Sequence, residues 1–475
     1  MESRLAGLPQ DLLLELAKWL DIRDLFSLLS TCSVIRNLQW HKALWIYAIW
    51  RLRTVQLHPL PLQHAQDLAA LSLEQLVDAV KVAHRLLQNL HSPEGPVPVF
   101  TTQFHAGWLI KRVICIPGTY LALVESYSGI SCWDLLTSQS VASLPKQANV
   151  GLLPASSSVC MDTPGKALVI GCVQPRLKNI QHLAAIWLDF TDRSNVTLTI
   201  DISPDVSNVS YPWRYLFASK EGIGLVTTSH LIYWVFETDA VIVQPHDHPL
   251  AQQSVILAHF RHGDYLYVSD GGTSERGPML DVIDLSHLSD HGSPGEILRL
   301  EQILTCSRVI LPPLDFPDPP DGLFGTYVKP PIAPLAAPCY GVFSITCLTY
   351  EDHLTRSCVL FWPSDIGEDA RLVLGRHAPK CFQHVSKVRQ CAVGSSGRYA
   401  LLLGYGDVDG DTTEATDYLA LLHLPPDAES FEFRRLDVGD IMLGSVVLAA
   451  LDDTLGLVVL LDHKGMLMAI SYART

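Results

Sequence analysis

Residues 455–473, LGLVVLLDHKGMLMAISYA, carry the pattern that decides the fold of most of this chain. Two short aliphatic runs flank Asp462-His463-Lys464-Gly465, a polar stretch that ends in glycine. Apolar runs of this length around a short polar turn are typical of an antiparallel β-hairpin. The stretch therefore predicts two paired strands.

The same pattern recurs six more times from residue 97 onward, with Gly, Pro, Asp and Ser between the runs. The other hairpin-like stretches are 120–136, 167–190, 224–236, 265–285, 343–362 and 399–424. Flanking runs add strands: RVICI (112–116) and SVASL (140–144) around the first stretch, and SVILAHF (254–260) and EILRLE (296–301) around the fourth. Four strands a repeat predict an all-β propeller of about seven blades.

Residues 97–104, VPVFTTQF, form a strand-like run that precedes the first repeat and lacks a partner there. The last hairpin lacks an outer strand. We expect 97–104 to pair with the GMLMAISYA strand, because an open ring would leave strand edges exposed.

The propeller region, residues 97–475, resembles diverged WD-repeat or quinoprotein-like propellers in its architecture. Trp133-Asp134 is its one literal WD dipeptide, and the Gly-His dipeptides are missing. The tryptophans of the strand runs are expected to pack in the core. They are Trp133, Trp187, Trp234 and Trp362.

The first 53 residues have a helical pattern instead. Pro9 suits the first turn of a helix and Asp11 its positive end, and leucines recur after them at helical spacing. Asp21 can cap a second helix, and a third amphipathic segment runs from about Trp40 to Arg53. Three short helices cannot bury all of this apolar surface among themselves, so an exposed patch is expected, which usually marks a partner.

These residues resemble the F-box pattern in their order and spacing. The matching residues are Leu8, Pro9, Asp11, Leu12, Leu13, Leu16, Leu20, Asp24, Leu25, Leu28, Cys32, Leu44 and Trp45. Departures are Ile35, where many F-boxes have tryptophan, and Gln39-Trp40, where a small acidic turn is common. An F-box followed by a WD-repeat-like propeller occurs in fungal F-box proteins.

The resemblance implies that residues 1–53 bind the Skp-type adaptor of a cullin-RING (SCF) ubiquitin ligase. The residues it assigns to adaptor binding are Leu8, Pro9, Leu12, Leu13, Leu16, Leu20, Leu25, Leu28, Cys32, Leu44 and Trp45. The chain would then be a non-catalytic substrate receptor, reaching cullin through the adaptor and holding an unidentified client on the propeller. A leucine-rich cap on the following domain, an F-box scaffold outside any ligase and a propeller hydrolase or lyase stay open as alternatives.

Residues 54–96 are expected to link these two parts. Within them LSLEQLVDAVKVAHRLLQNL (71–90) predicts one amphipathic helix. The residues expected on its common apolar face are Leu73, Leu76, Val77, Val80, Ala83, Leu87 and Leu90.

Composition excludes several classes. The chain has 475 residues, 48% of them hydrophobic, and a net charge of −15, so nucleic acid is not expected as the main partner. No run of about 20 apolar residues is free of charges, and no signal peptide is recognisable. We therefore expect no membrane partner and a cytoplasmic or nuclear location. The eleven cysteines are scattered and are expected to be reduced core residues.

No catalytic motif is present, and no cofactor is expected. Asp407, Asp409 and Asp411 resemble the start of a calcium loop, but Thr412 and Tyr418 replace the required glycine and glutamate. His246 and His248 have no third ligand nearby in the sequence. Both groups are interpreted as loop residues, with no metal. The proline-rich segment 311–339 is interpreted as an insertion between two strands.

Overall fold

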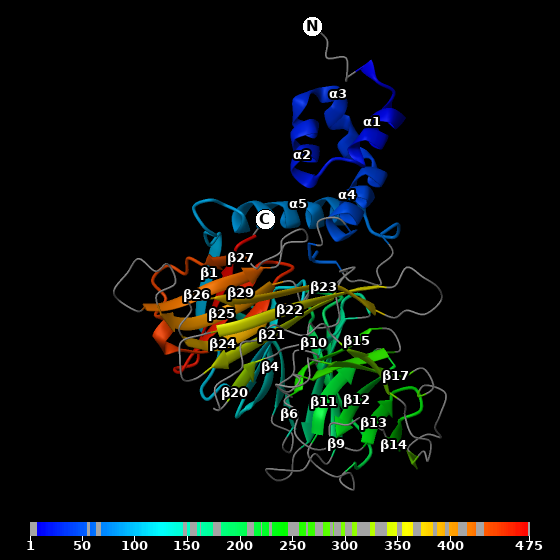
Figure 1. Cartoon of the computed structure of the whole chain (residues 1–475), viewed down its shortest axis with the longest axis vertical. Coiled ribbons are helices and arrows are strands. Elements are labelled where there is room, and N and C mark those ends of the chain that lie inside the picture. Colours follow the sequence, from blue (N-terminus) through cyan, green and yellow to red (C-terminus); the bar gives the residue numbers. More distant parts are fainter. Residues whose placement is uncertain are drawn as a thin grey trace.

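The computed structural model places the N-terminal helices at one end of the molecule and the strands at the other (Figure 1). Helix α5 (Leu73–Leu90) lies between them, across the end of the sheets. The structure describes residues 7–54, 58–62, 68–145, 150–152, 159–161, 163–173, 182–206, 213–219, 221–227, 230–245, 256–262, 265–270, 279–285, 288, 296–299, 306–310, 324–327, 340–348, 354–363, 372–382, 387–394, 399–406, 416–423 and 432–473.

The N-terminal elements start where their capping residues predict. Pro9 immediately precedes α1, and the Asp21 carboxylate accepts the Asp24 N–H at 2.7 Å at the start of α2. A turn made by two further elements, which the sequence pattern did not reveal, precedes the third expected helix. The elements are α1 (Gln10–Ala17), α2 (Ile22–Thr31), α3 (Ser33–Arg36), the 3-10 helix η2 (Asn37–Trp40) and α4 (Lys42–Thr54).

Among the described residues the strands form seven sheets. The first, in its hydrogen-bonded order, is β2 (Arg112–Cys115), β3 (Leu121–Ser126), β4 (Gly129–Asp134) and β5 (Gln139–Pro145). The second is β10 (Thr197–Ile202), β9 (His182–Asp189), β8 (Lys166–Val173) and β6 (Val150–Leu152), with β7 (Val159–Cys160) also on β8. The third is β11 (Trp213–Ala218), β12 (Gly222–Thr227), β13 (His230–Val235), β14 (Ala240–Pro245) and β18 (Ile297–Arg299).

The remaining four sheets have four strands each. The fourth is β15 (Ile256–His262), β16 (Tyr265–Asp270), β17 (Met279–Asp284) and β19 (Cys306–Ile310); the fifth is β20 (Phe324–Tyr327), β21 (Tyr340–Leu348), β22 (Leu354–Pro363) and β23 (Leu372–Phe382). The sixth is β24 (Lys387–Val393), β25 (Tyr399–Gly406), β26 (Thr416–His423) and β27 (Glu432–Arg435). The seventh is β1 (Phe100–His105), β30 (Met466–Ser471), β29 (Leu457–Asp462) and β28 (Val446–Asp452).

The sheets follow one another as a propeller does. Each sheet contacts the next in chain order, and β28 of the seventh contacts β2 of the first. The closing strand is the one expected, because β1 pairs antiparallel with β30 from Phe100 opposite Ser471 to His105 opposite Met466. Pairing the two ends of the region in one sheet joins the ring without an open seam.

All seven predicted hairpins are antiparallel strand pairs in the structure. One flanking strand was wrongly assigned: EILRLE contains β18, which pairs in parallel with β14 of the third sheet instead of joining the fourth. The outer strand of the fourth sheet is β19, on β17. Hydrophobic alternation predicts a strand but does not encode which free edge the strand will join.

Helix α5 has two apolar faces where the sequence analysis expected one. Most of the expected residues pack with α1, α2 and α4 in one core, but Leu90 does not. Val82, Leu86 and Leu90 pack instead into the core of the propeller. The single-face prediction is corrected, because residues 82, 86 and 90 form a second stripe at helical spacing.

Polar contacts fix the C-terminal end of α5 to the propeller. The Asn89 amide donates to the backbone oxygens of Val97 at 2.7 Å and Tyr472 at 2.8 Å, and its oxygen accepts the Val97 N–H. Gly456 has φ +57, and a Cβ there would lie 2.3 Å from Leu86 Cδ1, so the turn after β28 approaches the helix closely. Helix, closing strand and last hairpin therefore form one packed unit.

Buried carboxylates join the first sheet to its neighbours. Asp452, at the end of β28, accepts the Gly118 N–H at 2.7 Å and both the N–H and hydroxyl of Thr454. Glu125 of β3 accepts the Leu152 N–H of the second sheet and is within ion-pair distance of Lys111. Burial raises the pKa of Asp452 to about 7, and the hydrogen bonds from Thr454 and Gly118 oppose that rise.

We expect Leu86→Ala to destabilise the full chain by about 2–5 kcal/mol, because it leaves a cavity where the helix meets the propeller. The exposed Lys81 on the same helix is the matched control, and Lys81→Ala should change stability by less than about 0.5 kcal/mol. Denaturant unfolding measures both. Equal effects of the two substitutions would contradict the role given to α5.

Asp452 makes stability depend on pH. Its folded-state pKa lies above the ordinary value of about 4, so the folded chain binds this proton more tightly than the unfolded chain. The resulting stabilisation is full below about pH 4 and is lost as the pH rises through about 7. Thermal unfolding at about pH 5 and about pH 8 should show a smaller pH-dependent decrease for Asp452→Asn than for the wild type. An identical pH dependence in both proteins would refute this assignment.

Candidate docking surface

Helix α1 separates its leucines into two faces. Leu13 and Ala17 are buried in the helical core. Leu12, Leu16 and Trp19 are 52%, 45% and 73% exposed. Their spacing of four and three residues places them on one side of the helix and its C-terminal turn, and we call these three residues the α1 face.

Contacts along α4 hold α1 in this orientation. The Lys18 ammonium lies 4.4 Å from the centre of the Tyr47 ring, and the Arg51 guanidinium donates to the Lys18 oxygen at 3.5 Å. At the other end, the Gln10 amide contacts the His41 ring. Hydrogen bonds to Glu15 and Tyr47 raise the pKa of Lys18 above its ordinary value. Because both ends of α1 are fixed, its exposed face is a defined surface.

The interior of the module is satisfied without this face. Trp45 packs beside Phe26, with ring centres 6.0 Å apart, and its Nε1–H donates to the Gln39 oxygen at 2.8 Å. Phe26 also stacks on His84 of α5 at 4.7 Å, and burial lowers the pKa of His84. The residues of the α1 face are therefore not needed for the packing of the module's core.

The eleven residues assigned to adaptor binding divide into three groups. Pro9, Leu12 and Leu16 are exposed. Leu8, Leu20, Leu28 and Cys32 are half-buried, and Leu13, Leu25, Leu44 and Trp45 are buried. The four buried residues belong to the core that supports the other seven. A partner can therefore contact the three exposed residues and the accessible parts of the four half-buried ones.

Sequence reasoning missed four exposed apolar residues in the described part of the module: Trp19, Val34, Trp40 and Trp50. Trp19 follows Leu16 by three residues, a spacing that could have identified it. Val34 and Trp40 belong to α3 and η2, which were not expected as elements. Large exposed apolar side chains of this density are typical of protein-interaction surfaces.

The structure does not test the other candidate sites that the sequence suggested. Asp407, Asp409, Asp411, His246 and His248 lie outside the described residues, as does most of 311–339. Within the described part no group of three or more His, Cys, Asp or Glu side chains is placed to hold a metal. Burial raises the pKa of Cys132 and Cys172 to about 12, so these two thiols stay protonated.

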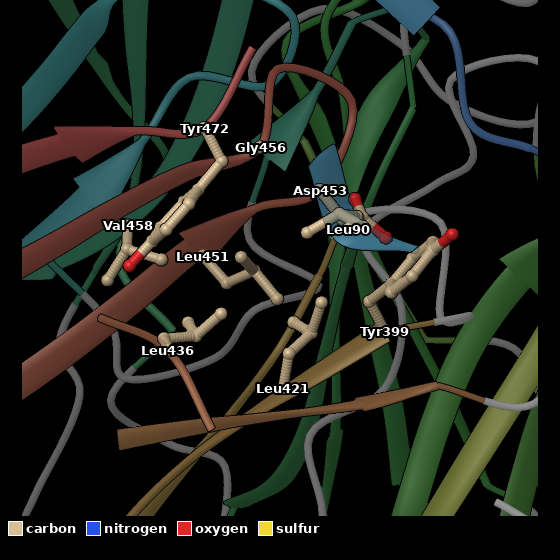
Figure 2. A pocket seen from close by; sticks show the side chains of 9 residues that line it. All are labelled: Leu90, Tyr399, Leu421, Leu436, Leu451, Asp453, Gly456, Val458 and Tyr472. Atoms are coloured by element: carbon tan, nitrogen blue, oxygen red, sulfur yellow. The ribbon is translucent and has the colours of Figure 1, made fainter. Parts of the chain in front are cut away.

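A small pocket lies where the end of α5 meets the sixth and seventh sheets (Figure 2). Aliphatic side chains make up most of its lining, with the Asp453 carboxylate and two tyrosine rings at its margin. Its free space of about 10 Å³ leaves room for about one water molecule.

None of the helices in the described ranges has the length and apolarity needed to span a bilayer.

Comparison with known proteins matches no family model and no curated sequence. Among solved structures the chain is similar to the WD40 domain of SCAP from fission yeast, with 9% identity, a TM-score of 0.40 and coverage of 77% of this chain and 85% of that one. It is also similar to the Nup133 β-propeller domain of Vanderwaltozyma polyspora (8%, 0.38, 78% and 97%) and to Kuenenia stuttgartiensis hydrazine synthase (8%, 0.41, 76% and 94%). The assignment of a propeller fold rests on this chain's own strand pairings and sheet contacts.

Leu13 and Leu16 provide a matched pair of variants. Leu13→Asp places a carboxylate in the helical core, where desolvation costs several kcal/mol, and should unfold the module. Leu16→Asp places it on the exposed side and should change stability by less than about 0.5 kcal/mol. Thermal unfolding followed by circular dichroism distinguishes them. A large loss of stability in Leu16→Asp would show that the α1 face packs against another part of the chain.

Proposed function

We propose that this chain is a substrate-receptor subunit of an SCF ubiquitin ligase. The helical module binds the Skp-type adaptor through the α1 face, and the propeller binds the client protein. The observation that carries the proposal is the exposure of Leu12, Leu16 and Trp19 on a module whose core, completed by α5, does not include them.

The position of the α1 face agrees with the F-box resemblance of the sequence. The Leu-Pro start and the leucine spacing that carry the resemblance belong to the segment from Leu8 to Leu20, and that segment includes the exposed side chains. Two leucines and a tryptophan on one rigid surface suit an apolar groove of a partner, since tryptophan is enriched among the residues that dominate binding energy.

The packing of α5 supports a receptor role for the whole chain. A receptor increases the effective concentration of the client's lysine near the ubiquitin carrier, and this requires a defined distance between adaptor and client. Helix α5 is packed into the helical core on one side and the propeller core on the other. A binding site on the propeller is thereby held at a set position from the α1 face.

Co-purification with a purified Skp-type adaptor tests the proposal. The wild-type chain should form a stable complex in size-exclusion chromatography, and Leu16→Asp combined with Trp19→Ser should weaken binding by roughly 100-fold or more. The control is Ile202→Ser, an exposed apolar residue on β10, which should bind like the wild type.

Two results would reject adaptor binding through this face: no complex with the wild type, or equal binding by the double variant. Adding cullin distinguishes a ligase subunit from an F-box scaffold, because only the ligase subunit should bring cullin into the same complex.

A further inference from the structure

The loop between β1 and β2 presents the most exposed aromatic–aliphatic pair on the described part of the propeller. Trp108 is 72% exposed and Leu109 is 70% exposed, side by side in the chain. Neither residue contributes to the propeller core, which takes Ile110 from the same loop. Stability of the propeller therefore does not explain why these two residues are apolar.

Neighbouring elements hold this loop in place. The Ala106 N–H donates to the Gly465 oxygen at 3.1 Å, and the Lys111 N–H donates to the Glu125 oxygen at 2.8 Å. The Trp108 ring packs beside the His105 ring, with centres 4.9 Å apart. Both ends of the loop are thus anchored, which lowers the entropy cost of binding.

The backbone of Leu109 is strained in this loop. Its φ is 55°, in the left-handed region that bulky residues rarely enter. A glycine would adopt this conformation without steric cost. A strained leucine that is also exposed is unfavourable for stability and solubility, and such strain is concentrated at functional sites.

The surface continues onto the first sheet and the last hairpin. Tyr127, in the turn after β3, is 56% exposed, and the Lys111 ammonium lies 4.7 Å from the centre of its ring. On the other side, the exposed Lys464 belongs to the turn between β29 and β30, where a Cβ at Gly465 would overlap the Gly107 oxygen. We call Trp108, Leu109 and Tyr127, with Lys111 and Lys464, the Trp108 surface.

The charge of this region differs in sign from that of the protein. Among the described residues its cations are Lys111, Arg112 and Lys464. Its carboxylates in the same described part are Glu125, which is buried and near both Lys111 and Arg112, and Asp462, which accepts the backbone N–H of Lys464. Three cations against two carboxylates leave one positive charge, in a chain whose net charge is −15. An acidic ligand is attracted here, although the chain as a whole is acidic.

A membrane surface fits less well than a protein segment. Anionic lipids attract basic residues by about 1 kcal/mol each, and a balance of one positive charge cannot offset the repulsion from the rest of an acidic chain. A peptide needs only local complementarity, and rigid aromatic anchors are typical of peptide sites.

We propose that the Trp108 surface binds a segment of the client protein that carries one large apolar side chain among acidic residues. The apolar side chain packs against Trp108, Leu109 and Tyr127, and the acidic residues interact with Lys111 and Lys464. The identification of the bound segment as part of a ubiquitination client rests on the proposed function; the binding itself does not.

The surface lies on the side of the propeller away from α5. The turn that follows β28 packs against Leu86 of the helix, whereas the turn that contains Lys464 is at the opposite end of the same hairpin. Adaptor and client can therefore bind at the same time.

The test uses phage-displayed random peptides selected on the purified full-length chain, followed by fluorescence anisotropy with labelled synthetic copies. Selected peptides should combine a Trp, Phe or Leu with several Asp or Glu residues. Trp108→Ser should weaken their binding roughly tenfold or more, and Lys111→Gln with Lys464→Gln should weaken it several-fold and reduce its salt dependence. The matched control, Ile202→Ser, should leave affinity unchanged.

Leu109→Gly separates binding from folding. Glycine removes the strain, so the unfolding temperature should stay the same or rise, while peptide affinity falls. If Leu109 has a structural role alone, Leu109→Gly should lower the stability of the chain and leave its affinity for the peptides unchanged. That result would overturn the proposal.

Other outcomes also overturn it: no enriched peptides, peptides without acidic residues, equal binding by Trp108→Ser, Trp108-dependent self-association, or Trp108-dependent binding to phosphatidylserine vesicles. Leu16→Asp with Trp19→Ser should bind the peptides like the wild type. A failure of adaptor binding and a failure of client binding are therefore observed separately.

Discussion

The position of one helix between two hydrophobic cores is the constraint on which the rest of this structure depends. Leu76, Val80 and Ala83 of α5 face the helical module, and Leu86 and Leu90 face the propeller. Because side chains three and four residues apart share a face, an 18-residue helix can carry two separate stripes. Neither core is complete without it, so module and propeller are coupled through buried contacts instead of a free linker.

The same helix organises the closure of the ring. Asn89 binds the backbone of Val97, just before the closing strand, and of Tyr472, just after the last strand. The helix end thus holds together the residues next to β1 and β30, beside the first pair of the two strands, Phe100 and Ser471. Pairing of the two most distant parts of the propeller sequence is costly in chain entropy, and the helix reduces that cost by holding both ends at one place.

The two exposed apolar surfaces described above, both outside these cores, lie at opposite ends of the molecule. The α1 face is apolar and belongs to a helix fixed by Tyr47 and Arg51. The Trp108 surface is aromatic, strained at Leu109 and locally positive in an acidic chain. Exposed apolar groups of this size do not stabilise the folded monomer. Covering them with a partner buries apolar surface and therefore favours binding. The role that we propose for this arrangement is that of a protein that binds two partners at a fixed separation.

The amino-acid sequence by itself determined the local elements: seven hairpins, the closing strand, the capped helix α2 and the linker helix. It could do so because strand and helix periodicity and turn residues act over a few neighbouring positions. Only the tertiary structure decided which leucines of α1 are buried, that α5 has a second face, and that β18 joins β14. It also brought the Tyr127 ring against Lys111 and the turn of Lys464 against Gly107, which no sequence spacing suggested. Each of these depends on which free edge or face is nearest in the folded chain, and that proximity is a property of packing between distant segments.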